Sequence, residues 1–105
     1  MMPERDVEKK LVDGIRKLGG KAYKWTSPGN AGVPDRLVFL PGGRIFLVEL
    51  KTERGVLSKV QKAQHRVLKN LGREVLTLYG PIDVQDHLDD WERMLKEDKY
   101  YGTRK

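Results

Sequence analysis

Apolar residues recur at three- and four-residue intervals near the start of the chain, over residues 4–18. This spacing is typical of a helix with one buried face, and Gly19-Gly20 would end it. The residues expected to point inward are Val7, Leu11, Val12, Ile15 and Leu18. Residues 21–25 then predict a short strand.

Two apolar runs in the middle of the chain predict a β-hairpin. Residues 37–40 and 44–50 are rich in strand-forming residues, and Pro41-Gly42-Gly43 between them is typical of a turn. The second run is almost continuously apolar, as expected for a strand buried on both faces. Because side chains alternate along a strand, Glu49 and Lys51 should point to the same side of the sheet.

The second half predicts a helix, a strand and a further helix. Ser58 would begin the first of these helices, residues 74–79 form the strand, and Asp83 caps a last helix that runs to Asp98. The face of the first helix expected to pack on the sheet holds Val60, Ala63, Val67, Leu68 and Leu71. The apolar stripe of the last helix holds Val84, Leu88, Trp91 and Leu95. The expected fold is therefore α/β, a mixed sheet flanked by helices in the order αβββαβα, with a βαβ crossover around the middle helix.

The predicted hairpin brings three charged residues to one end of the sheet. Asp35 begins the first strand, and Glu49 and Lys51 end the second. Charges in so apolar a strand are costly to bury without partners. Two carboxylates beside a lysine suit a divalent-metal site for phosphodiester hydrolysis. The alternative for each residue alone is structural, with Asp35 capping a turn and Glu49 and Lys51 marking a strand that frays into solvent.

Length and composition narrow the kind of site. The 105 residues suit one domain, expected over residues 1–98, with a short basic tail at 99–105 that is either an unstructured end or another phosphate contact. The chain has no cysteine, which excludes disulfides and thiolate metal ligands. His65 and His87 are its two histidines, so an oxygen-ligand site for Mg²⁺ or Mn²⁺ is favoured over zinc.

The net charge of +6 is unevenly distributed along the chain. Residues 54–73 contain no Asp or Glu, whereas residues 83–98 contain seven acids against two basic residues. Basic residues recur at three- and four-residue intervals on one face of the predicted middle helix, at Lys59, Lys62, Arg66, Lys69 and Arg73. This stripe predicts contact with a phosphate backbone, with a solvated helix face as the alternative. The acidic last helix should lie away from DNA.

The loop at residues 26–33 leads directly into Asp35. Its glycines do not form a nucleotide-cradling motif, since no Gly-Lys-Ser/Thr occurs. Ser27 and Asn30 are expected to contact the DNA backbone beside the metal. A plain connecting loop is the alternative.

Three blocks of the sequence together resemble the VRR-NUC domain: G-V-P-D-R from Gly32, G-G-R-I-F-L-V-E-L-K from Gly42, and L-S-K-V-Q from Leu57. The resemblance covers about residues 4–80. That family belongs to the PD-(D/E)xK nuclease superfamily, which shares the restriction-endonuclease-like fold. The resemblance implies a stand-alone phage or bacterial nuclease that uses magnesium or manganese and acts on structured DNA.

The resemblance also implies roles for individual residues. Asp35 and Glu49 would be metal ligands, with the backbone carbonyl of Leu50 as a third. Lys51 would orient the attacking water or stabilise the negative charge that builds on phosphorus.

Glu8 and Gln61 match further family positions, and each has a structural alternative. Glu8 would bind the metal directly or through water, although acids in an early helical turn favour the helix dipole anyway. Gln61 follows the lysine strand as in the family, but it also completes a capping box with Ser58. The sequence leaves both roles open.

Taken together, these features predict a structure-specific DNA endonuclease. Two-fold substrates such as Holliday (four-way) junctions need paired cuts, and stand-alone VRR-NUC proteins resemble junction resolvases, so a homodimer is expected. A flap or linear-duplex nuclease is one alternative, and a basic nucleic-acid-binding module without catalysis is another. No membrane segment, signal peptide or small-molecule cofactor beyond the metal is expected. The expected location is the cytoplasm, that of the host if the protein is phage-encoded.

Overall fold

The computed structural model describes residues 1–102 of the chain, with side chains described through Asp98. Seven elements follow one another along the chain: α1 (Glu4–Lys17), β1 (Lys21–Lys24), β2 (Arg36–Leu40), β3 (Arg44–Lys51), α2 (Lys59–Asn70), β4 (Val75–Tyr79) and α3 (Gly80–Gly102). This is the predicted order.

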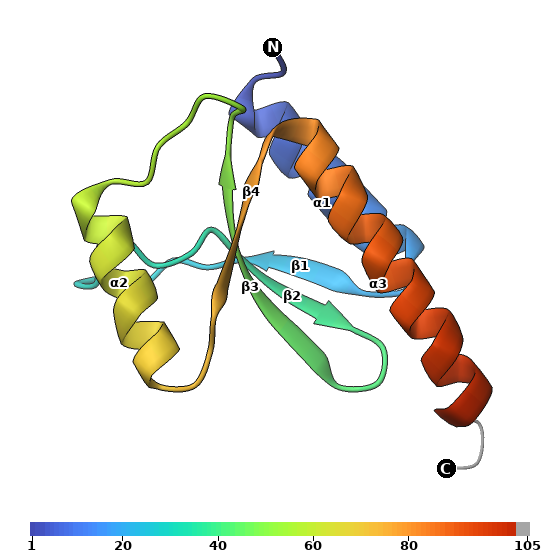
Figure 1. Ribbon diagram of the computed structural model, residues 1–105. Coiled ribbons are helices and arrows are strands. Elements are labelled where there is room, and N and C mark those ends of the chain that lie inside the picture. The colour runs from blue at the N-terminus through green and yellow to red at the C-terminus, as the bar shows by residue number, and fades with distance from the viewer. Residues whose placement is uncertain (103–105) are drawn as a thin grey trace.

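The four strands form one mixed sheet in the order β1-β2-β3-β4. The first three strands are antiparallel neighbours, whereas β3 and β4 pair in parallel through the crossover helix α2. Helices α1 and α3 cover one face of the sheet, and α2 lies on the other (Figure 1). The mixed sheet, the hairpin and the βαβ crossover predicted from the sequence are confirmed.

The main core lies between the sheet and helices α1 and α3. Val38, Val48 and Leu50 point from the strands into this layer, where they join Leu11 of α1 and Trp91 of α3. The expected inward residues of both helices are buried or partly buried there: Val7, Leu11, Val12, Ile15, Leu18, Val84, Leu88, Trp91 and Leu95. The amphipathic patterns of α1 and α3 therefore predicted their packing correctly.

The prediction for the packing face of α2 was wrong for four of its five residues, and right for Leu68, which is partly buried. Among the residues expected to pack, Val60, Val67 and Leu71 are each at least half exposed, and Ala63 is exposed as well. The side chains of α2 that are partly covered belong to Gln61, Gln64, His65 and Leu68. Polar side chains thus turn toward the sheet, because a charged group on β3 provides them with hydrogen-bond partners.

The start of α3 also differs from the prediction. The helix begins at Gly80, three residues before Asp83, so Asp83 is not its N-cap. The carboxylate of Asp83 instead accepts a hydrogen bond of 2.8 Å from the backbone N–H of Tyr79, at the end of β4. Gly80 has a φ of +79°, which glycine adopts without strain, and this permits the abrupt start.

At its other end α3 continues through residues 99–102, which were expected in the tail, while residues 103–105 lie outside the described residues. Among the helices of the described part, none combines the length and the apolar character needed to cross a bilayer.

Candidate active site

The candidate site lies on the face of the sheet that α2 partly covers. Leu47 and Glu49 of β3 point to this face, because the intervening Val48 and the following Leu50 point into the main core. Asp35 immediately precedes β2, whose Arg36 pairs with Val48, so Asp35 reaches the level of Glu49. The hairpin therefore brings the two carboxylates together, as the sequence predicted.

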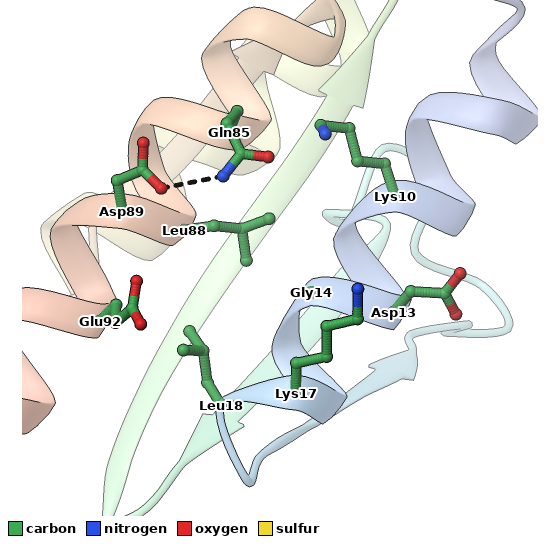
Figure 2. Close-up of a pocket in the computed structure, with 9 residues that line it drawn as sticks. All are labelled: Lys10, Asp13, Gly14, Lys17, Leu18, Gln85, Leu88, Asp89 and Glu92. Carbon is green, nitrogen blue, oxygen red and sulfur yellow. Dashed lines mark hydrogen bonds between the residues drawn. The ribbon is translucent and has the colours of Figure 1, made fainter.

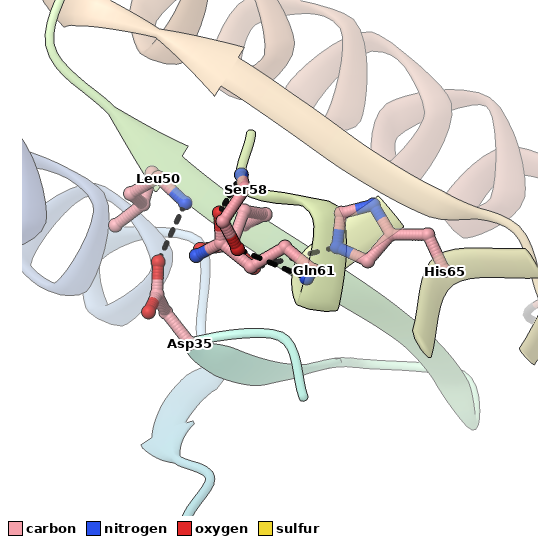
Figure 3. A network of polar contacts seen from close by, with 6 residues as sticks. Asp35, Leu50, Ser58, Gln61 and His65 are labelled. Carbon is pink, nitrogen blue, oxygen red and sulfur yellow. Dashed lines mark hydrogen bonds and ion pairs between the residues drawn. The ribbon is translucent and has the colours of Figure 1, made fainter. Parts of the chain in front are cut away.

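Asp35 is held by the backbone on both sides. Its carboxylate Oδ2 accepts a hydrogen bond of 2.8 Å from the N–H of Leu50 (Figure 3). Its carbonyl accepts one of 2.9 Å from the N–H of Trp25, which extends the β1–β2 pairing. The first contact fixes the carboxylate beside β3, and the second fixes the backbone of Asp35 beside β1.

Glu49 is buried, with 1% of its surface exposed, and α2 supplies a partner for each of its carboxylate oxygens. Gln61 donates from Nε2 to Oε2 at 3.2 Å, and His65 Nε2 lies 3.4 Å from Oε1. Gln61 and His65 are one helical turn apart and therefore share a face of α2. Figure 3 shows both side chains extending from α2 toward β3.

Burial first, and then the neighbouring Asp35 carboxylate, together raise the pKa of Glu49 to about 8, while the Lys51 ammonium acts in the opposite direction. Burial also lowers the pKa of His65, which favours its neutral form near pH 7. Without a cation Glu49 is therefore largely protonated near pH 7, because burial and the neighbouring Asp35 carboxylate disfavour its charged form.

Gln61 completes the predicted capping box and also contacts Glu49, while its catalytic role stays a prediction. Its Oε1 accepts from the N–H of Ser58 at 2.9 Å, and its own N–H donates to Ser58 Oγ at 3.1 Å, which completes the capping box. The same side-chain conformation directs Nε2 to Glu49. The cap that begins α2 therefore also orients the amide toward the site.

Glu8 lies on α1 and is engaged by an arginine. Its Oε1 accepts a hydrogen bond from Arg36, the residue directly after Asp35, and Arg36 also donates to the carbonyl of Ala22 at 3.3 Å. The structure thus places Glu8 in an ion pair that ties α1 to the hairpin. Its role as a metal ligand stays a prediction.

Lys51 ends β3 on the same side of the strand as Glu49. A Cβ atom added at Gly55 would lie 2.9 Å from the Cβ of Lys51, so the loop after β3 passes close over the lysine stem. The Lys51 charge acts to lower the pKa of both Glu49 and His65.

His65 is the site residue that the sequence reasoning missed, since it was considered there as a zinc ligand alone. The available signal was its position four residues after Gln61, which puts both side chains on one face of any helix. That signal becomes informative when the packing face of α2 is known to be polar.

The five basic residues predicted to bind DNA, Lys59, Lys62, Arg66, Lys69 and Arg73, are all exposed. Arg73 lies beyond the end of α2, contrary to the prediction, and donates to the carbonyl of Ile45 at 3.0 Å. In the loop before Asp35, Asn30 donates to Ser27 Oγ at 3.1 Å, so these two residues form a local turn. This loop packs on the start of α2, because a Cβ atom at Gly32 would lie 2.7 Å from the carbonyl oxygen of Val60.

A separate groove of about 420 Å³ lies between α1 and α3 (Figure 2). Lys10, Asp13 and Lys17 line it from α1, and Asp89 and Glu92 line it from α3, so basic side chains occur on the α1 wall alone. Close helix packing forms its floor, where a Cβ atom at Gly14 would lie 2.4 Å from a methyl group of Leu88. None of the residues predicted for catalysis lines this groove.

The residues around Asp35 and Glu49 fit a hard divalent cation. Two adjacent carboxylates, one of them buried with a raised pKa, are oxygen donors whose mutual repulsion a cation would relieve. Within residues 1–102 no group of three or more His, Cys, Asp or Glu side chains is arranged to hold a metal ion. Two side-chain ligands are therefore available, and further ligands would come from the backbone or water.

The chain was compared with known proteins by sequence and by structure. The sequence matches no protein-family model. It is 46% identical over 86 residues to "Putative nuclease p44" of Acyrthosiphon pisum secondary endosymbiont phage 1, an alignment that spans 82% of this chain and 88% of the relative. The fold is similar to a solved structure described as a VRR_NUC domain, with a TM-score of 0.76 and 30% sequence identity over 82% of this chain and 94% of that one.

The mixed sheet, with its hairpin and βαβ crossover, is that of a nuclease with the restriction-endonuclease-like fold. The chain belongs to the VRR_NUC family.

Proposed function

We propose that this nuclease is a metal-dependent DNA endonuclease that hydrolyses phosphodiester bonds in branched DNA, at Holliday junctions as a homodimer. The observation that carries the proposal is the buried Glu49, which lies beside Asp35 with each of its oxygens facing a polar side chain of α2. A structural charge pair would be neutralised within the protein, whereas here two carboxylates face each other.

Asp35, Glu49 and the carbonyl of Leu50 are the proposed ligands of Mg²⁺ or Mn²⁺. Such a cation supplies a Lewis acid for the scissile phosphate and lowers the pKa of the attacking water. The N–H of Leu50 holds Asp35 in place, and Gln61 and His65 hold Glu49. Lys51 supplies a positive charge on the same side of the strand, suited to orient water or to stabilise the pentacovalent phosphate.

The exposed basic stripe on α2 is proposed to bind the phosphate backbone. It lies on the helix that also contacts Glu49, so a strand that follows the stripe passes close to the site. The Ser27–Asn30 turn packs beside the start of the same helix and is proposed as a further backbone contact. The acidic residues of α3 lie on the opposite side of the sheet, away from this path (Figure 1).

The test is a cleavage assay with a synthetic four-way junction, a flap and a linear duplex, each in Mg²⁺, Mn²⁺ or EDTA. We expect metal-dependent cleavage by wild type, fastest on the junction, and a loss of at least a hundredfold for Asp35→Ala and Lys51→Ala. Ile82→Ala is the control, because Ile82 is 75% exposed on α3 and is none of the proposed ligands or DNA contacts. Absence of cleavage on every substrate would contradict the nuclease mechanism and favour a binding module.

The homodimer needs its own measurement, because paired cuts require two sites. Sedimentation velocity at micromolar concentration should give a species of twice the 12.1 kDa chain mass. A monomer alone, with and without junction DNA, would contradict the paired-cut proposal and favour the flap or linear-duplex alternative.

A further inference from the structure

Two aromatic side chains are exposed on the part of the site face that carries β1 and β2. Tyr23 of β1 is 49% exposed and Phe39 of β2 is 39% exposed. Their rings pack edge to face, with centroids 5.6 Å apart. Both alternate with core residues, since Ala22 and Val38 point to the α1–α3 side, so Tyr23 and Phe39 share the face of Glu49.

The strand register places this aromatic pair beside the candidate active site. Tyr23 pairs with Leu37, which is two residues along β2 from Asp35. Two residues of a strand span about 7 Å, so Tyr23 lies in the row of side chains next to the carboxylates, and Phe39 lies one row further. The hydrogen bond from Trp25 N–H to the Asp35 carbonyl fixes β1 in this register.

The positive charge beside Tyr23 and Phe39 suits a negatively charged nucleotide. The ammonium of Lys21 lies 4.7 Å from the centre of the Tyr23 ring. Lys21 is exposed, so its flexible side chain can leave the ring and contact a phosphate instead. An aromatic surface with a cation beside it offers a stacking surface for a base and a charge for its backbone. A second copy of this basic chain would bring like charges together at the same place.

We propose that Tyr23 and Phe39 form a platform on which an unpaired base of the DNA substrate stacks, beside the candidate active site. This inference rests on the proposed function and specifies its substrate. Bases inside a duplex are stacked on their neighbours and cannot reach such a surface, whereas an unpaired base near a branch point exposes its face. The platform would therefore favour DNA with an unpaired nucleotide close to the cut.

The test measures binding in EDTA, where cleavage does not occur. Fluorescence anisotropy would compare a blunt duplex with a forked duplex that carries unpaired thymines, for wild type, Tyr23→Ala and Phe39→Ala. We expect each substitution to weaken fork binding about tenfold and to leave blunt-duplex binding unchanged, because base–aromatic stacking contributes affinity of this order. Tyr23→Phe should restore fork binding, and Ile82→Ala should match wild type.

A second readout reports stacking directly. A fork with 2-aminopurine at the unpaired position should lose fluorescence on binding wild type and not on binding Tyr23→Ala. Thermal melting of each variant by circular dichroism separates loss of stacking from loss of fold.

Equal fork binding by Tyr23→Ala and wild type would overturn the platform, as would an equal loss for fork and blunt duplex. Conversion of a wild-type dimer to a monomer by Tyr23→Ala would show that a second copy covers this face and would also overturn it. Wild type that quenches the probe but never cleaves would support the platform while contradicting the proposed nuclease mechanism.

Discussion

Glu49 is the residue whose environment departs furthest from what its sequence neighbours suggest. It lies in an apolar strand, is almost fully buried, and faces Asp35 on one side and α2 on the other. Such a group lowers the stability of the fold, because a buried carboxylate loses the hydration that it has in the unfolded chain. The cost of this arrangement can be measured.

Glu49→Gln should stabilise the metal-free protein. The folded-state pKa of about 8 lies above the ordinary value of 4.5, so the contribution of Glu49 to stability is complete below pH 4.5 and is lost as pH rises toward 8. Glutamine has no such dependence. In EDTA at pH 8 the variant should be more stable by roughly 1–3 kcal/mol, with little difference near pH 4. Urea unfolding across this pH range provides the measurement, and an E49Q variant that is less stable than wild type at pH 8 would contradict the buried-carboxylate description.

Ser58 and Gln61 allow the helix cap to be separated from the contact with Glu49. Ser58→Ala removes the capping hydroxyl and should cost about 1 kcal/mol of stability with a small effect on cleavage. Gln61→Ala removes the cap partner and the donor to Glu49, so its cleavage rate should fall at least tenfold further. Both variants are assayed at a temperature below the unfolding midpoint of the less stable one. Equal cleavage rates would mean that Gln61 acts through the cap alone.

At the scale of elements, α2 shows how an apolar pattern can mislead. Its apolar residues recur at helical spacing, yet the side that faces the sheet is mostly polar, because Glu49 on β3 offers acceptors there. Strand alternation and the short hairpin turn were read correctly, since both depend on local geometry. Which side of α2 meets the sheet depends on a partner located 12 residues or more away in the sequence.

Neighbouring residues on α2 provide a matched test of this orientation. Val67 is 52% exposed, whereas Leu68 is partly buried. Val67→Ser should change the free energy of unfolding by less than about 0.5 kcal/mol, while Leu68→Ser should lower it by about 1–2 kcal/mol. The measurement is denaturant unfolding at low protein concentration. A cost for Val67→Ser as large as that for Leu68→Ser would restore the packing face that the sequence suggested, which held both residues.

At the scale of the whole molecule, charge is divided between the two faces of the sheet. The basic stripe lies on α2, and the acidic residues cluster on α3 beyond the sheet. This division follows from topology, because the crossover carries α2 to the face opposite α1 and α3. A polyanion should therefore approach from the α2 side.

Salt dependence measures this directional binding. Replacing Lys62, Arg66 and Lys69 by Gln should reduce the slope of log K against log salt concentration by about 2–3 for duplex DNA in EDTA. The matched control replaces Lys9, Lys10 and Lys17 of α1 by Gln, which changes net charge equally on the other face. If both triple variants lose the same slope, net charge rather than the stripe governs binding.

The sequence by itself determined the order of elements, the hairpin and the presence of Asp35, Glu49 and Lys51 at one end of it, because alternation, helical spacing and turn residues act over short distances. The tertiary structure alone decided that α2 supplies Gln61 and His65 to Glu49, that Arg36 engages Glu8, and that Tyr23 and Phe39 share the site face. Each of these contacts joins residues at least 12 positions apart. Local patterns carry no information on which distant side chains will contact a buried charge.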